Sequence, residues 1–182
     1  MKKIFFASIA TLLLFLSSTI ALADWNPTDK AEEEMAMKDT ITRFLQADPT
    51  LQYFFDKAAG YAVFPDVGKG AFIAGVGYGR GWLYEGGKPI GKSSILQLSA
   101  GAQIGGQIYS ELIFFRDTQL VNDFKFSRFE LGAQISAVAV TSGAGRASTY
   151  TNGIAVFILP KGGIMAEASV SGQRFAFEPF KE

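Results

Sequence analysis

Residues 91–115 alternate between apolar and polar side chains with a period of two. The even positions carry Leu96, Leu98, Ala100, Ala102, Ile104, Ile108, Leu112 and Phe114, and the odd positions carry Gln97, Ser99, Gly101, Gln103, Gly105, Gln107, Tyr109 and Glu111. This pattern predicts β-structure with the even positions buried and the odd positions on a wetter face. The run exceeds the roughly 3–10 residues of an ordinary strand, and Gly105-Gly106 interrupts it without changing its parity. We therefore predict one long strand bent at these glycines, or a three-residue bulged turn.

Residues 71–84 also alternate, but one face of this predicted strand is bare. Glycines at 75, 77, 79 and 81 face one way, and the other face carries Phe72, Ala74, Val76, Tyr78, Arg80, Trp82 and Tyr84. Such a face weakens a strand unless something approaches it closely. The pattern favours a helix, or a tightly coiled sheet, pressed against the glycines. The alternative is a slot in which an apolar ligand takes the place of side chains.

Two helices are predicted before the strands. The first covers residues 28–46, with Thr28 as its N-cap, and the second begins at Asp48-Pro49. In the second, Leu51, Phe54, Phe55 and Ala58 share one face. We expect both helices to pack on the sheet. The alternative, a first helix lying on a membrane, is less favoured because it carries three consecutive glutamates at 32–34.

The later elements complete the fold class. A short helix is predicted over 117–125, and strands over 129–139, 153–159, 164–170 and 173–177. The continuous apolar run 153–159 indicates a strand buried on both faces. Long strands with glycine bends are typical of curved sheets. We predict a β-rich α+β fold: a strongly curved antiparallel sheet or partly closed barrel, with the two N-terminal helices packed on it.

Residues 1–23 have the pattern of a secretory signal peptide. Lys2 and Lys3 precede an apolar run, and Ala21-Leu22-Ala23 forms a small-x-small cleavage site. We therefore expect three parts: the signal peptide (1–23), an N-terminal helical segment (24–56) and the main domain (57–182). The Lys-Lys start and the compact arrangement of this segment are typical of bacterial signal peptides. This pattern predicts secretion across the inner membrane to a periplasmic or outer-membrane-associated location.

Composition excludes most catalytic chemistry. The chain has no histidine and no cysteine, so Ser-His-Asp systems, Cys-His systems and His/Cys zinc sites are all excluded. It carries 17 basic and 17 acidic residues, and loss of Lys2 and Lys3 with the signal peptide leaves a small negative charge. No overall field for nucleic acid exists. We expect no enzyme activity, no cofactor, no metal and no nucleic-acid partner.

Several short motifs together resemble a known family. They are Gly60-Tyr-Ala-Val-Phe-Pro65, Gly75-Val-Gly-Tyr-Gly-Arg-Gly81, Ser93-Ser94-Ile95, Gly101-Ala-Gln-Ile-Gly-Gly106, Gly143-Ala-Gly-Arg146 and Lys161-Gly-Gly-Ile-Met-Ala166, which leads to Gly172. In this order they resemble the SYLF domain over about residues 57–177. The resemblance implies lipid binding and, for eukaryotic endocytic members, binding of phosphoinositides and actin filaments. The signal-peptide pattern argues against cytoskeletal actin as a partner of a secreted bacterial protein, so that role is not carried over.

The sequence thus favours a non-catalytic lipid- or phospholipid-binding protein of the bacterial cell envelope, peripheral to a membrane. The candidate contacts are basic residues in or beside glycine-rich turns together with two strand aromatics: Lys69, Arg80, Lys88, Lys92, Arg146, Lys161, Tyr78 and Trp82. Arg80 has a second interpretation, a cation–π contact with a neighbouring ring. The alternative functions are a small integral outer-membrane β-barrel and an envelope structural or interaction protein.

Overall fold

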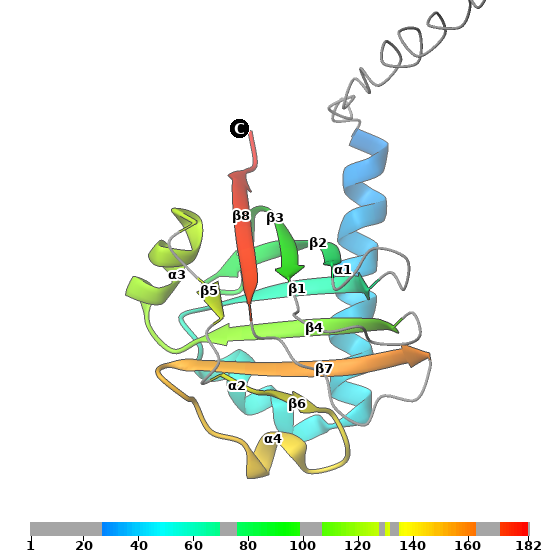
Figure 1. The fold of residues 1–182 in the computed structure, drawn as a ribbon, viewed down its shortest axis with the longest axis vertical. Helices are drawn as coiled ribbons and strands as arrows, with labels where there is room; N and C mark the ends of the chain where they lie inside the picture. Colours follow the sequence, from blue (N-terminus) through cyan, green and yellow to red (C-terminus); the bar gives the residue numbers. More distant parts are fainter. Residues whose placement is uncertain are drawn as a thin grey trace, which may run out of the picture.

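The computed structural model describes residues 27–69, 76–98, 107–127, 130–131, 135–162 and 172–181. The expected signal peptide, the Gly105-Gly106 bend and the strand predicted at 164–170 lie outside them. The elements along the chain are α1 (Pro27–Ala47), the 3₁₀ turn η1 (Pro49–Leu51), α2 (Gln52–Lys57), β1 (Gly60–Lys69), β2 (Val76–Glu85), β3 (Lys88–Leu98), β4 (Gln107–Phe115), α3 (Thr118–Lys125), β5 (Glu130–Leu131), β6 (Ala137–Ala139), α4 (Ala144–Ala147), β7 (Ile154–Gly162) and β8 (Gln173–Pro179) (Figure 1).

The strands form one eight-stranded sheet in the order β5-β8-β3-β2-β1-β4-β7-β6. The first three long strands are antiparallel neighbours, and β4 returns to pair with β1 on its far side. This order is a Greek key. It corrects the expectation for residues 91–115, because β3 and β4 are two strands separated in the sheet by β2 and β1. Parity alone could not show this, because a crossover can preserve it as well as a bend can.

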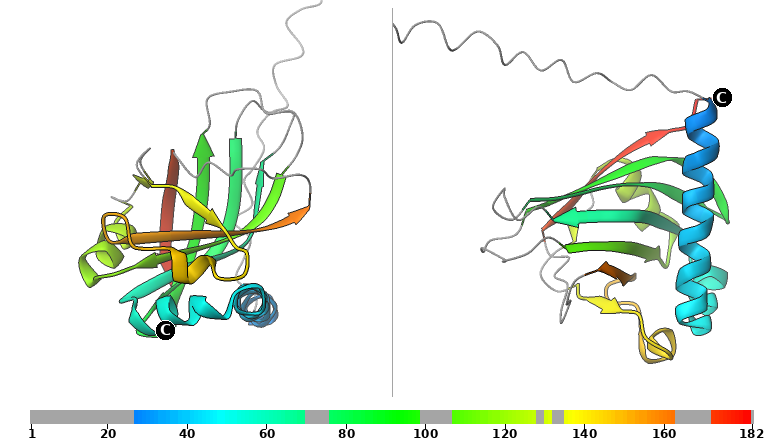
Figure 2. Two further views of the ribbon diagram at one scale, coloured as in Figure 1. Left: turned by 90° about the horizontal axis from the view of Figure 1, so that it is seen from below. Right: turned by 90° about the vertical axis from the view of Figure 1, so that its right-hand side faces the viewer.

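The sheet is strongly curved but open, ending at β5 and β6 within the described ranges (Figure 2). Tyr109 on β4 donates a hydrogen bond to Gln97 on β3, with 3.0 Å between the two oxygens. These strands are three spacings apart, about 14 Å in a flat sheet. Their side chains meet because the sheet curls around them, which defines an interior face and an outer face. The curved sheet is confirmed, whereas closure is not seen and the β6–β7 pair is parallel, so the sheet is mixed.

The bare face of β2 allows this curvature. A Cβ atom at Gly81 would collide with the carbonyl oxygen of Val63 and stand 2.5 Å from Cδ1 of Phe64. A Cβ at Gly79 would stand 2.8 Å from the carbonyl oxygen of Asp66. These contacts belong to β1, which bulges between Val63 and Asp66. The coiled-sheet interpretation is therefore correct at these two glycines: the neighbouring strand presses against them.

The interior face is covered by α3, which lies within the helix predicted over 117–125. Asp117 caps it by accepting a hydrogen bond from the backbone N–H of Leu120 at 3.1 Å. Phe124 packs between rings of β4 and β8, with its centroid 5.2 Å from Phe115 and 5.0 Å from Phe175. The packing therefore differs from the expectation of two N-terminal helices on the sheet, because α3 packs on the opposite face from α1. The number of helices differs as well.

The N-terminal helical segment covers the outer face. Phe44 of α1, Leu51 of η1 and Phe54 of α2 are fully buried against β1, β2, β4 and β7. The second predicted helix is in fact two pieces, a 3₁₀ turn followed by α2. Asp48 tightens this start by accepting a hydrogen bond from the backbone N–H of Thr50 at 3.0 Å. The strand β7 lies between both cores and is buried from Ile154 to Ile158, as its continuous apolar run predicted.

Candidate functional site

Three of the predicted contact residues lie at alternate positions of β2 on the outer face. Tyr78 is 50% exposed and Arg80 is exposed, whereas Trp82 is 1% exposed. The Nε of Arg80 donates to the hydroxyl of Tyr78 at 3.0 Å, and its guanidinium lies 5.9 Å from the centre of that ring. This bond is the main cause that raises the pKa of Arg80 above its ordinary value. The cation–π interpretation of Arg80 is confirmed.

Trp82 and Lys92 share a partner on α1. The indole Nε1 of Trp82 donates to Glu33 Oε2 at 3.2 Å, and Nζ of Lys92 lies 2.8 Å from the same oxygen. Phe180 closes the other side of the indole at 4.8 Å between ring centres. Trp82 is thus a buried residue in this fold. A direct lipid contact by Trp82 would first require α1 to move.

An apolar row crosses the outer face beyond the reach of α1. Tyr78 is opposite Leu96 on β3 and opposite Gly68 on β1, and Gly68 is opposite Ile108 on β4. Residues directly opposite one another in a sheet share a face. Leu96 is 43% exposed and Ile108 is 50% exposed. Tyr78, Leu96 and Ile108 together are called the apolar row below. The alternation in the sequence predicted that Leu96 and Ile108 lie in the core. This prediction was wrong, because both side chains are exposed.

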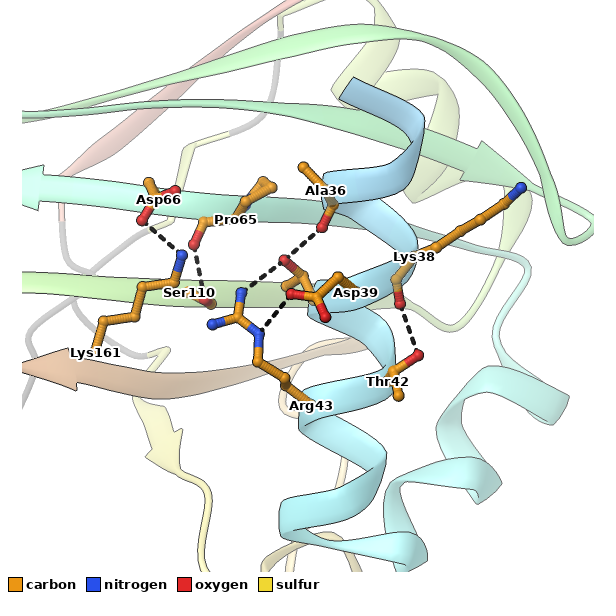
Figure 3. Close-up of polar contacts among 10 residues, drawn as sticks. Ala36, Lys38, Asp39, Thr42, Arg43, Pro65, Asp66, Ser110 and Lys161 are labelled. Atoms are coloured by element: carbon orange, nitrogen blue, oxygen red, sulfur yellow. Dashed lines mark hydrogen bonds and ion pairs between the residues drawn. The ribbon is translucent and has the colours of Figure 1, made fainter. Parts of the chain in front are cut away.

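The next position along the same strands is polar. Asp66 is opposite Arg80 and accepts a hydrogen bond from Nζ of Lys161 at 2.7 Å. Figure 3 shows Lys161 reaching from β7 toward Asp66. Two of the six predicted basic residues, Arg80 and Lys161, are therefore brought beside one carboxylate and lie next to the apolar row.

The remaining predicted basic residues are spread over several elements. Lys88 is exposed at the start of β3, directly after the β2–β3 turn, and Lys69 ends β1. Arg146 is exposed on α4, whose start is held by Asp48: a carboxylate oxygen of Asp48 accepts from the backbone N–H of Gly145 at 2.6 Å. The six predicted basic residues thus do not form a single cluster. Their role in lipid binding stays a prediction.

Sequence reasoning missed a polar cluster on the interior face. The interior bridge, as we call it, consists of Gln97, Tyr109, Glu111 and Gln173, all fully buried. Gln173 Nε2 on β8 donates to Glu111 Oε2 on β4 at 2.9 Å, across four strand spacings of the sheet. Alternation assigned Gln97, Tyr109 and Glu111 to the wetter face. That assignment was wrong, because the curled sheet folds this face inward.

Burial dominates the electrostatics of the interior bridge. It raises the pKa of Tyr109 far above the ordinary tyrosine value, and the nearby Glu111 raises it further. Within the described ranges, no group of three or more His, Cys, Asp or Glu side chains is arranged to hold a metal ion. The described helices include none that is both long and apolar enough to cross a membrane.

Comparison with known proteins agrees with the motifs. Residues 96–179 match the family model Ysc84, described as "Las17-binding protein actin regulator". The chain is similar to beta cell expansion factor A of Aeromonas veronii, with 29% identity over 157 residues that cover 82% of this chain. It spans 59% of the length of that relative. Neither similarity indicates a catalytic family. The SYLF resemblance is confirmed: the family-model match places this domain at residues 96–179.

Proposed function

We propose that this protein is a non-catalytic lipid-binding protein that attaches peripherally to a membrane of the bacterial cell envelope. The observation that carries the proposal is the apolar row, three large side chains in register on β3, β2 and β4, with only Gly68 of β1 between the last two, each between 43% and 50% exposed. Contiguous exposed apolar surface on a soluble domain marks a site of interaction. Arg80 and Lys161 border the row and supply positive charge for an anionic headgroup.

Location in the envelope rests on the signal-peptide pattern of residues 1–23. An integral outer-membrane barrel, the alternative function, needs a closed sheet whose lumen face is polar. Here the sheet ends at β5 and β6 within the described ranges, and apolar clusters cover both faces of its central strands. These two features favour a peripheral mode of attachment. A structural or interaction role in the envelope, without lipid, is the outcome if the following experiment fails.

The test is co-sedimentation of the protein lacking residues 1–23 with vesicles of zwitterionic lipid and with vesicles that also contain anionic lipid. We expect binding to the anionic vesicles that falls only in part as salt rises, because salt screens charges and not apolar contact. The double variant Leu96→Ser, Ile108→Ser should lose most of the salt-resistant part.

The matched control is Phe126→Ser. Phe126 is 68% exposed beyond the end of α3, so its replacement removes a similar apolar area elsewhere. Equal losses for the control and the double variant would contradict the assignment of the row. No binding of the folded wild-type protein to any vesicle would contradict lipid binding itself.

A further inference from the structure

The two halves of α1 contact the sheet through different chemistry. In the C-terminal half, Phe44 is fully buried and Met37 is 4% exposed. In the N-terminal half, the helix meets its neighbours through the charged ends of Lys30 and Glu33. Met35, the large apolar residue of that half, is 68% exposed to solvent. The first half is therefore held by polar contacts and the second by a core.

Glu33 supplies most of those polar contacts. Its carboxylate receives the indole N–H of Trp82 and the ammonium of Lys92, and both charged side chains keep 34% of their surface exposed. Lys30 adds a cation–π contact, with Nζ 4.5 Å from the centre of the Phe180 ring. Partly exposed ion pairs contribute little to stability. Local opening of a segment held in this way costs far less than global unfolding.

We propose that residues 27–36 form a strap that masks a second, aromatic part of the outer face, and that this part binds an anionic membrane surface when the strap opens. Under the strap lie Trp82, which is 1% exposed, and Lys92, both among the lipid contacts expected from sequence. The Glu33 carboxylate forms an ion pair with Lys92, and an anionic headgroup would bind the same ammonium group. Helix and headgroup therefore compete for the same cation. This inference rests on the proposed function and adds its regulation.

The competition has a simple thermodynamic form. A surface that binds only the open state has an apparent affinity reduced by the fraction of molecules that are open. Removal of the Glu33 contacts raises that fraction. With about 1 kcal/mol in an ion pair and its accompanying hydrogen bond, the affinity should rise about fivefold.

The experiment compares Glu33→Ala with Glu32→Ala. Both variants remove one negative charge from α1 and introduce the best helix former, but Glu32 is exposed on the helix surface. Both are made in a Trp25→Phe background, since the chain has two tryptophans and this change leaves Trp82 as the sole fluorophore. The readouts are acrylamide quenching of Trp82, hydrogen–deuterium exchange of residues 27–36 and 41–47, and co-sedimentation with anionic and zwitterionic vesicles.

We expect Glu33→Ala alone to increase quenching of Trp82 and exchange in residues 27–36, while residues 41–47 stay protected. Its binding to anionic vesicles should rise about fivefold, with little change for zwitterionic ones. A further variant, Lys92→Met, removes the ion pair but keeps the indole bond to Glu33, so it should loosen the strap less and give no gain in anionic binding.

Two kinds of failure are distinguishable. If Glu33→Ala and Glu32→Ala behave alike in quenching and exchange, the strap is overturned whatever the vesicles show. If the strap opens but vesicle binding does not rise above wild type, the masking of a membrane-binding surface is overturned. Absence of binding by every protein, including the wild type, counts against the proposed function as well.

Discussion

The two faces of the sheet differ in how completely they are filled. On the interior face, side chains from seven strands and α3 pack until even Gln97, Glu111 and Gln173 are fully buried. On the outer face, helices cover one end, and at the other end the apolar row is exposed. Both faces carry aromatic and polar residues, so composition does not separate them. The position of a residue relative to the curl of the sheet does.

The difference assigns distinct tasks to the two faces. The interior face fixes the fold, because its polar groups are hydrogen-bonded across strands that would be far apart in a flat sheet. The outer face retains unburied apolar area and half-exposed ion pairs that can exchange partners. Changes on the interior face should therefore affect stability, whereas changes in the exposed part of the outer face should affect binding.

The largest loss of stability should come from adding a side chain to a β2 glycine on the interior face, where β1 packs closely. Gly81→Val places a side chain against the Val63 carbonyl and the Phe64 ring, and the overpacking should cost about 3 kcal/mol or more of unfolding free energy. The matched control is Gly68→Val on β1, where a Cβ meets no atom within 4 Å. Urea denaturation followed by circular dichroism measures both variants. A loss below about 1 kcal/mol for Gly81→Val would mean that β1 can move to accommodate the new side chain. The interior face would then be less tightly packed than we infer.

The second effect concerns the interior bridge. Tyr109→Phe removes a hydroxyl that bonds Gln97 and lies 3.5 Å from Gln173, at a cost of about 1–3 kcal/mol near neutral pH. We also expect the free energy of unfolding to depend on pH in the alkaline range, because the pKa of Tyr109 is raised in the folded state. Above pH of about 10 the unfolded chain releases a proton that folded Tyr109 keeps, so stability falls as pH rises.

The pH response separates the hydroxyl from simple packing. In Tyr109→Phe the alkaline loss of stability should be less steep than in the wild type. It should not vanish, because burial also raises the pKa of Tyr150, to about 12. Denaturation midpoints at neutral pH and at several values above pH 10 provide the measurement. Parallel curves for the two proteins would show that Tyr109 does not stay protonated in the fold.

The sequence predicted the parts of this fold that local patterns determine. Asp117 indicated the start of α3, and the glycines of β2 indicated that another segment packs closely against that strand. The apolar run 153–159 indicated a strand that is buried on both faces. Local patterns could not give the strand order. The alternation around Leu96 and Gln97 was detected, but which face becomes the interior depends on how β1 and β4 return across the sheet.

The candidate site was predictable in its residue types and not in its partners. Arg80 beside Tyr78 follows from spacing two along one strand. The contacts from Glu33 to Trp82 and Lys92 join residues more than 45 positions apart in sequence, and no local pattern encodes them. The interior bridge was missed for the same reason. Its one available signal was the concentration of Gln, Tyr and Glu on the odd positions of β3 and β4.

A third and smaller effect should come from Asp48, which joins η1 to α4. Burial by itself would raise the pKa of Asp48, but hydrogen bonds from Gly145, Thr50 and Gly143 hold it below the ordinary value. Asp48→Asn turns an amide toward these donors and should cost about 1–2 kcal/mol at neutral pH. A lowered pKa stabilises the fold above the unfolded value of about 3.9, and this contribution is lost as pH falls through the folded value. Wild type and variant should therefore converge in acid, and a gap that persists at pH 2 in thermal unfolding would contradict the assignment.

The smallest effect on stability should come from the apolar row, and it tests the comparison most sharply. Leu96→Ser removes a side chain that is 43% exposed, whereas Ile95→Ser on the preceding residue of β3 removes one that is 1% exposed. We expect a change within about 0.5 kcal/mol for Leu96→Ser and about 3 kcal/mol or more for Ile95→Ser, because the second replaces buried apolar volume with a hydroxyl. Urea denaturation gives both values, and the same samples serve for vesicle co-sedimentation. Leu96→Ser should keep its stability and lose part of the salt-resistant vesicle binding. A large loss of stability for Leu96→Ser would mean that Leu96 belongs to a core, and its assignment to a membrane-binding row would be contradicted.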